Sequence, residues 1–503
     1  QTPAVPPVAA RAAGSVLADL SPDALAAELT TAAGLSGAEQ PLARRLLTAL
    51  HERTDELNLT AANRQHLYRP VWRCTPLSEP PPLDSPGTWL ILDSGHGLGE
   101  PLARALAARG ARGVLLRRGS PELAAAQTFY ADTLAAVRGA VLQHRSGAAP
   151  LRGIIDLWSA AEADAPAEPA GGGLRTLVSA LGALRALIDG EYRVPLWLLT
   201  RGAVSIGPAS ELGAPAQAAL WGLGRVLFLE HPELAGGLID LPAATAEADV
   251  EPLLSGLVNE LLGAAFEEQV ALRAAGRYVQ RLARHPSAGP RAAWKTHGTA
   301  LVTGGLGALG LQVARFLIRC GAQSLVLTSR RGLNTPGAAE KVAALQSLGA
   351  HVTVAEVDLG DAAAMRALME RIDTSLPPLR VVVQAAGVVH GSPLRVLQPE
   401  QLERVLAPKV RGTLVLDELT RDRELDAFIC FSSIAGIWGA PEMGSYAAAN
   451  AFLDAWAQQQ RAHGRPALSI AWGPWEGGGM ASAERIAQLR DRGLRAFQPE
   501  EAL

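Results

Sequence analysis

Polar side chains in residues 428–454 have the types and spacing needed to deliver a proton to a substrate. Ser432 and Ser433 end an apolar, aromatic-rich run that predicts a buried strand. Tyr446 and Asn450 are four positions apart in an Ala-rich segment, which predicts a helix that presents both on one face. A hydroxyl at a strand end facing a phenol at a helix start is suited to proton transfer.

A glycine-rich turn earlier in the chain could bind the pyrophosphate of a dinucleotide. It follows an apolar strand and precedes a helical pattern, and its residues are Thr303, Gly304, Gly305, Leu306, Gly307 and Gly310. Glycines allow a tight turn and let backbone N–H groups approach a pyrophosphate at the helix N-terminus. A packing turn is the alternative, but the strand before it and the helix after it favour dinucleotide binding.

Other predicted strand ends supply candidate contacts to the rest of the dinucleotide. After the second strand stand Ser329, Arg330 and Arg331, where an acid would accept the ribose 2′-hydroxyl of NAD. Basic side chains suit a 2′-phosphate instead, so they favour NADP, the alternative being two solvated arginines. The remaining candidates are Asp358 and Leu359 after the third strand, Ala385, Ala386 and Gly387 after the fourth, and Pro474 near the C-terminus.

An internal repeat indicates that the chain contains one α/β domain twice. Residues 87–111 align without a gap on residues 298–322, and both read as strand, glycine turn and helix. We predict an α/β fold of two tandem Rossmann-like subdomains with parallel sheets. The expected ranges are 1–66 for a linker and short helical segment, 67–288 for the first subdomain and 289–503 for the second.

The two copies differ at the positions that matter for chemistry. The first has Asp93 where the second has Gly304, and a carboxylate there would repel a pyrophosphate. It has Thr200 and Arg201 in place of the serine pair, and no tyrosine corresponding to Tyr446. We therefore expect the first subdomain to keep the fold without binding cofactor, and the second to carry the site.

Composition describes a globular protein with well-filled cores. Of 503 residues, 48% are hydrophobic and 19% charged, and the net charge is −3, which gives no support for nucleic-acid binding. No apolar run approaches the length of a membrane span. Beginning at Gln1 without a signal peptide and ending at Leu503 in a helical pattern, the sequence is interpreted as a piece of a longer polypeptide.

Cysteine and histidine usage points to a reducing compartment and no metal. Cys74, Cys320 and Cys430 are far apart, and the last two lie in apolar patterns, so buried free thiols in the cytoplasm are expected. The ten histidines form no metal-ligand cluster.

Several motifs together resemble the ketoreductase domains of modular type I polyketide synthases, within the short-chain dehydrogenase/reductase superfamily. The resemblance covers residues from about 67 to the end and rests on YRPVWR (68–73), TGGLGALG (303–310), TSRRG (328–332), AAG (385–387), PKVRGTLVLDEL (408–419), FSSIAGIWG (431–439), SYAAANAFLDA (445–455) and AWGPW (471–475). It implies a structural first subdomain and a second that uses NADPH to reduce a β-ketoacyl thioester, held on an acyl carrier protein, to a β-hydroxyacyl thioester.

The resemblance also implies a role for each candidate catalytic residue. Tyr446 would be the general acid, with a pKa that a nearby cation can lower, and Ser433 would stabilise the oxyanion. Most short-chain reductases have lysine where this chain has Asn450. The polyketide ketoreductases take it from an earlier helix, and Lys409 matches that motif. For Lys409 alone, a solvated surface lysine is the alternative.

Two further residues bear on stereochemistry. The Leu-Asp-Asp motif of the D-type enzymes is absent from 389–391, where Val-His-Gly stands, and Trp438 occupies the position typical of the A-type. Met443 replaces the histidine of the epimer-selecting subtype. An L-configured hydroxyl is therefore expected, the alternative being that Trp438 only packs in the core. Residues 477–480 resemble the family's lid over the active site.

Two alternative functions remain open, and the resemblance also implies partners. One alternative is a redox-inactive or epimerase-type ketoreductase-like domain, and another is a free-standing sugar or steroid reductase, which the degenerate first copy disfavours. The expected partners are the acyl carrier protein and other polyketide synthase domains. Residues 1–66 resemble a small helical dimerisation element in size, the alternative being a remnant of an upstream linker.

Overall fold

The computed structural model describes residues 66–77, 87–93, 95, 97–117, 126–144, 149–161, 172–207, 213–245, 247–263, 267–285, 294–476, 483–491 and 493–502. The expected N-terminal helical element, the boundary near residue 288 and the lid at 477–480 lie outside these residues.

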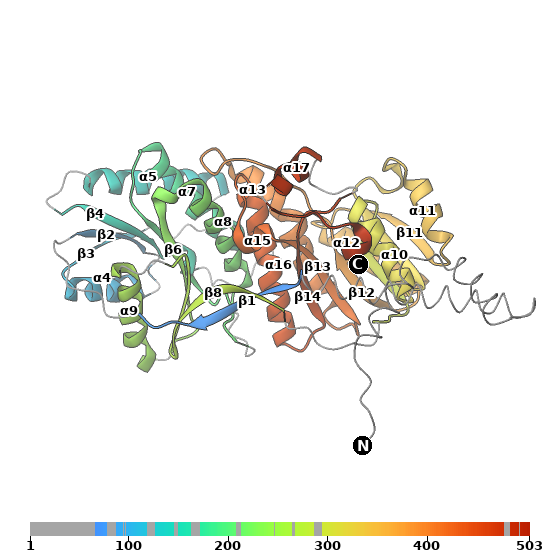
Figure 1. The fold of residues 1–503 in the computed structure, drawn as a ribbon, viewed down its shortest axis with the longest axis horizontal. Helices are drawn as coiled ribbons and strands as arrows, with labels where there is room; N and C mark the ends of the chain where they lie inside the picture. Colours follow the sequence, from blue (N-terminus) through green and yellow to red (C-terminus); the bar gives the residue numbers. More distant parts are fainter. Residues whose placement is uncertain are drawn as a thin grey trace, which may run out of the picture. The chain divides into compact units, whose positions relative to one another are not determined.

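The first sheet has eight strands (Figure 1). They are β1 (Tyr68–Cys74), β2 (Thr88–Asp93), β3 (Arg112–Arg117), β4 (Leu151–Asp156), β5 (Leu196–Arg201), β6 (Ala235–Leu241), β7 (Gln269–Arg273) and β8 (Gly276–Arg284). Their order is β1-β8-β7-β6-β5-β4-β2-β3, parallel from β3 to β7, with β7 and β8 antiparallel. The helices are α4 (Gly99–Ala108), α5 (Ala126–His144), α6 (Trp158–Ala161), α7 (Gly172–Asp189), α8 (Pro215–Glu230), η2 (Pro232–Leu234) and α9 (Glu247–Leu262).

The second sheet has six strands, all parallel. They are β9 (Thr299–Thr303), β10 (Ser324–Ser329), β11 (His351–Glu356), β12 (Leu379–Gln384), β13 (Ala427–Ser433) and β14 (Ala467–Trp472). Their order, β11-β10-β9-β12-β13-β14, is that of the doubly wound dinucleotide-binding fold. Five neighbouring strands of the first sheet, β3-β2-β4-β5-β6, follow one another in the same order as β10-β9-β12-β13-β14 in the second. The predicted fold class of two Rossmann-like subdomains is therefore confirmed.

The helices of the second subdomain lie between these strands, except for two short helices that follow β14. They are α10 (Ala308–Arg319), η3 (Gly332–Asn334), α11 (Ala338–Gln346), α12 (Ala362–Ser375), α13 (Pro399–Leu406), η4 (Ala407–Arg411), α14 (Gly412–Thr420), α15 (Ala435–Trp438), α16 (Gly444–Ala462), α17 (Ala483–Asp491) and α18 (Pro499–Ala502). The chain reverses direction across the sheet between β9 and β12, so a crevice is expected outside the carboxyl ends of these two strands. None of the described helices is both long and apolar enough to cross a lipid bilayer.

Helices α8 and α16 pack closely, one from each subdomain, as Figure 1 shows with α8 in green and α16 in orange. The approach requires glycine at Gly222, because a Cβ there would lie 2.3 Å from the carbonyl oxygen of Ala447. Around this contact, buried apolar side chains of both subdomains, among them Trp221 and Phe452, form one continuous core. The helix that begins beside the candidate site is thus held by the first subdomain.

Candidate active site

The two serines at the end of β13 have different surroundings. Ser432 is buried, and its hydroxyl donates to the carbonyl oxygen of Asn450 at 3.2 Å, which ties the strand to α16. Ser433 is half-buried at the carboxyl edge of the sheet, and its Oγ accepts from the backbone N–H of Ala435 at 3.2 Å. Ser433, and not Ser432, is therefore the partly exposed serine at the carboxyl edge of the sheet.

Tyr446 is the third residue of α16 and is half-buried. Burial raises the pKa of its phenol above the usual value, while hydrogen bonding with Ser433 and Asn450 acts in the opposite direction. The sequence-based expectation of a lowered pKa is thus wrong for the free protein. The physical reason is that desolvation disfavours the phenolate more than its neighbours stabilise it. A phenol with a raised pKa keeps its proton at neutral pH, as a proton donor must.

Lys409 lies beneath this phenol. Its side chain is only 2% exposed, its Nζ donates to the carbonyl oxygen of Phe431 at 2.7 Å, and the same nitrogen lies 5.6 Å from the centroid of the Tyr446 ring. Burial lowers its pKa to about 8, although Cys430 and Asp454 act to raise it. Lys409 is therefore not the solvated surface lysine of the alternative interpretation.

A π-helical turn, η4, directs Lys409 inward. Pro408 lacks a backbone N–H and cannot continue the regular hydrogen-bond ladder between α13 and α14, so the chain widens there. The carbonyl oxygen of Pro408 accepts from Nε2 of Gln384 at 2.6 Å, at the end of β12. This contact fixes the lysine-bearing turn against the carboxyl edge of the sheet.

Asn450 and Asp454 continue the line of Tyr446 along α16. Asn450 is fully buried and its Nδ2 donates to the carbonyl oxygen of Tyr446 at 2.8 Å, whereas its Oδ1 has no protein hydrogen-bond partner among the described residues. Asp454 accepts from Ser469 Oγ at 2.6 Å, and burial raises its pKa to about 6. Asp454 was not among the site residues predicted from the sequence, although its position four residues after Asn450 was the available signal.

The glycine turn has the shape that a pyrophosphate site needs. Gly304 has a φ of +65°, which favours glycine, and a Cβ on Gly310 would lie 2.4 Å from the Gly304 carbonyl oxygen. Gly307 caps α10, whose free N–H groups therefore face the turn. Thr303 Oγ1 accepts from the backbone N–H groups of Ala385 and Ala386 at 3.0 and 3.1 Å, which joins β9 to β12. This glycine turn (residues 303–310), which we call the glycine cradle, fits a dinucleotide.

The other predicted cofactor residues lie along the same edge. Arg330 and Arg331 are exposed at the end of β10, and Ser329 Oγ lies 3.0 Å from Thr335 Oγ1. Asp358 accepts from the backbone N–H of Gly360 at 2.8 Å. The rest are Leu359, which is buried, Gly387, which is half-buried, and Pro474, whose carbonyl oxygen accepts from the Phe497 N–H at 2.8 Å.

The corresponding turn of the first subdomain is filled by its own side chains. Asp93 is buried and accepts from the backbone N–H of Gly95 at 3.1 Å and from Arg117 Nε at 3.2 Å. A Cβ on Gly99 would lie 2.5 Å from the Asp93 carboxyl group, so no space remains between them. In place of the serine pair, Thr200 donates to the buried Asp240 at 2.7 Å. Among the described residues of this turn, the buried Asp93 carboxylate lies where it would repel a pyrophosphate.

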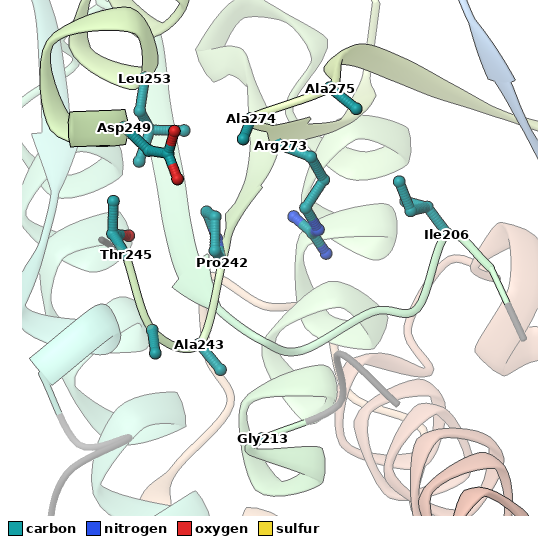
Figure 2. Close-up of a pocket in the computed structure, with 11 residues that line it drawn as sticks. Ile206, Gly213, Pro242, Ala243, Thr245, Asp249, Leu253, Arg273, Ala274 and Ala275 are labelled. Atoms are coloured by element: carbon teal, nitrogen blue, oxygen red, sulfur yellow. The ribbon is translucent and has the colours of Figure 1, made fainter. Parts of the chain in front are cut away.

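A cavity of about 480 Å³ lies in the first subdomain, next to the carboxyl ends of β6 and β7 (Figure 2). Pro242, Asp249, Leu253 and Arg273 are among its lining residues. The guanidinium of Arg273 donates to the carboxylate of Asp240 and to backbone carbonyl oxygens, so its charge is already neutralised. The cavity includes no residue of the Ser433–Tyr446–Lys409 cluster.

The two predicted stereocontrol residues flank the loop that leads into α16. Trp438 ends α15 and is 43% exposed, so the interpretation of this residue as core packing is wrong. Met443 is the N-cap of α16, three residues before Tyr446. Among the described residues, no group of three or more metal-ligating side chains could hold a metal ion.

Strand order and the glycine cradle place the second subdomain among the NAD(P)-dependent oxidoreductases of the short-chain dehydrogenase/reductase type. A family model described as the KR domain matches residues 298–477, and one described as the Rossmann fold domain of the polyketide synthase extender module SpnB matches residues 95–282. The chain belongs to the ketoreductase domains of modular polyketide synthases, which act on a keto group.

Individual relatives agree with this placement. The chain is 46% identical over 332 residues to the pikromycin polyketide synthase component PikAIII of Streptomyces venezuelae, covering 66% of this chain and 21% of that protein. It is 46% identical over 325 residues to erythronolide synthase EryA3 of Saccharopolyspora erythraea, covering 65% and 10%. The chain thus spans only a small part of these multidomain relatives. A solved A1-type ketoreductase matches with 37% identity and a TM-score of 0.75, over 88% of this chain and 90% of that one.

Proposed function

We propose that this chain reduces a β-ketoacyl thioester to a β-hydroxyacyl thioester with NADPH. The observation that carries the proposal is the cluster at the carboxyl ends of β12 and β13. There the Lys409 ammonium lies 5.6 Å from the centroid of the Tyr446 ring, and Ser433 acts to lower the pKa of the phenol, beside a cradle that fits a dinucleotide. Each member of this cluster can act on a ketone oxygen that is gaining negative charge.

Three protein side chains assist the reaction at the ketone oxygen. The bound cofactor supplies hydride to the ketone carbon. The Ser433 hydroxyl donates a hydrogen bond to the ketone oxygen and stabilises the developing oxyanion. The Tyr446 phenol donates its proton to the same oxygen, and the Lys409 ammonium stabilises the phenolate that remains. With a pKa of about 8, Lys409 carries its charge at neutral pH.

A spectrophotometric assay tests the proposal. The chain is mixed with NADPH and a β-ketoacyl thioester, and the loss of the reduced nicotinamide absorbance is followed. Turnover with a β-hydroxyacyl product is the expected result. Binding of NADPH without turnover would instead favour the redox-inactive or epimerase-type alternative.

The acyl group is proposed to arrive on the phosphopantetheine arm of an acyl carrier protein, next to other polyketide synthase domains. The support is that the matched relatives are polyketide synthases several times longer than this chain. The prediction that residues 1–66 dimerise, like the domain ranges 67–288 and 289–503, stays a prediction.

The preference for NADPH over NADH should depend on the two arginines after β10. In an Arg330→Ala/Arg331→Ala double variant, the ratio of kcat/KM for NADPH to that for NADH should fall by about 10- to 100-fold. A charge-assisted hydrogen bond to a phosphate is worth roughly 1.5–3 kcal/mol, which accounts for this range. Arg366→Ala, which removes an exposed arginine on α12, is the matched control. An unchanged ratio in the double variant would exclude both arginines from recognition of the 2′-phosphate.

The configuration of the product should depend on Trp438. We propose that the unsubstituted chain gives an L-configured hydroxyl, and that Trp438→Ala gives a mixture of both configurations, because the substrate loses the wall that selects its orientation. Trp294→Ala, another exposed tryptophan in the second subdomain, is the control. Chiral chromatography of the β-hydroxy product measures the ratio. A single L product from Trp438→Ala would rule out this role.

A further inference from the structure

A carboxylate from the first subdomain holds two loops of the second. Glu230 is the last residue of α8, which packs beside α16 (Figure 1). Its Oε2 accepts from the backbone N–H of Leu394 at 2.7 Å, and its Oε1 accepts from the backbone N–H of Glu442 at 2.6 Å. Both donors are main-chain groups of the other subdomain, so one side chain fixes two separate segments of backbone.

These two segments border the candidate active site. Leu394 lies in the connection that leaves the carboxyl end of β12 after Ala385 and Ala386. Glu442 lies between Trp438 and Tyr446, next to Met443. The carboxyl edge of a parallel sheet is where ligands bind in such folds, so both loops flank the position of the ketone.

The backbone of Glu442 is strained, which indicates that the contacts between Glu230 and the two loops fix its conformation. Glu442 has a φ of +68°, in the left-handed region that residues other than glycine rarely adopt. Its N–H donates to Glu230, and its carbonyl oxygen accepts from the backbone N–H of Ser392 at 2.7 Å. A strained residue persists only where its surroundings fix it, and such residues gather at functional sites. Glu442 therefore links both loops through a geometry that Glu230 stabilises.

Two other contacts from α8 reach the part of the loop that precedes Glu442. The guanidinium of Arg225 donates to the carbonyl oxygen of Gly436, in α15, while Gln269 and Gln280 hold its other nitrogen atoms. A Cβ on Gly439 would lie 3.0 Å from the backbone of Arg225. The segment between Ser433 and Tyr446 thus follows the surface of α8 along its length.

We propose that Glu230 is a positioning residue for the ketone reduction, holding the loop before Tyr446 and the loop after β12 in the arrangement that orients the acyl substrate. The first subdomain then contributes to substrate orientation and stereocontrol and is more than a structural support. The inference rests on the proposed function, because orientation matters only if the chain reduces a prochiral ketone.

Substitution of Glu230 separates this role from simple folding. Both partners are N–H donors, and an amide offers only one acceptor, so Glu230→Gln keeps the shape and loses one of the two hydrogen bonds. Glu230→Ala loses both. Glu233→Gln is the matched control, because its carboxylate lies 3.1 Å from Nδ1 of His231, within the first subdomain.

Hydrogen exchange and stereochemistry are the two readouts. In Glu230→Gln one of the two amides, Leu394 or Glu442, should exchange about tenfold faster, and in Glu230→Ala both should, as expected for the loss of a charge-assisted hydrogen bond. The KM for the acyl thioester should rise by about tenfold with kcat changed less than about threefold, and the minor configuration of the product should increase. Affinity for NADPH should be unchanged, because the cradle lies between β9 and α10.

The outcomes are distinguishable. Unchanged exchange and an unchanged product ratio in both Glu230 variants would overturn the proposal, as would an equal effect of Glu233→Gln. If the unsubstituted chain binds NADPH without reducing the ketone, the proposed function fails. Faster exchange at Leu394 and Glu442 in that case would still show that Glu230 fixes the two loops.

Discussion

Replacing Tyr446 with phenylalanine should lower kcat for ketone reduction by about 10²- to 10⁴-fold, the range typical of a lost general acid. The substitution removes one oxygen atom from a half-buried ring on α16, so the helix and its packing against α8 should remain. The affinity for NADPH should change little, because the glycine cradle is built from β9 and α10. Single-turnover kinetics and a cofactor titration measure the two effects separately.

Tyr130→Phe is the matched control for this prediction. Tyr130 is a buried tyrosine in α5 of the first subdomain, and burial also raises the pKa of its phenol. Loss of its hydroxyl tests whether any buried phenol affects turnover through stability alone. If Tyr446→Phe kept more than about a tenth of the activity, another group would have to supply the proton, and our assignment would be wrong.

The sequence was sufficient to predict the repeat, the fold class and the glycine turn, because each rests on local patterns. Strand, glycine turn and helix recur in both copies, and the predicted positions of Thr303, Gly304 and Gly310 coincide with the β9–α10 turn. Chain order also located the carboxyl edge of each strand, where parallel sheets bind ligands. The departure of the first copy from the dinucleotide-binding pattern could also be predicted, because Asp93 replaces a glycine.

The surroundings of the site could not be predicted in the same way, because they depend on contacts between distant residues. Nothing in the sequence around Glu230 or Arg225 indicates that they hold loops more than 160 residues away. Burial of Tyr446 and Lys409 likewise depends on packing between α16, η4 and β13, so the directions of their pKa shifts required the structure. Propensity and periodicity describe single elements and carry no information on such contacts.

Replacing Lys409 with methionine should lower activity while leaving stability at neutral pH unchanged or higher. Methionine fills a similar apolar volume but removes the cation under the Tyr446 ring, so kcat should fall by about 10²-fold or more. The folded pKa of Lys409, about 8, lies below its usual value of 10.5, so burial of the charged form costs stability at pH 7. A melting temperature at or above that of the unsubstituted chain, together with low kcat, is the expected combination.

The role of Lys409 also predicts how kcat/KM and stability change with pH. Below pH 8 Lys409 is protonated in the folded protein, and its cation is lost as the pH rises through about 8, so kcat/KM should decline above that pH. Between pH 8 and 10.5 the unfolded chain binds more protons at this site than the folded one, so Lys409 makes stability rise with pH there. Both features should be absent in Lys409→Met and present in Lys295→Met, which replaces an exposed lysine. A decline near pH 8 that persists in Lys409→Met would assign it to a different group, and Lys409 would then not be the cation that supports Tyr446.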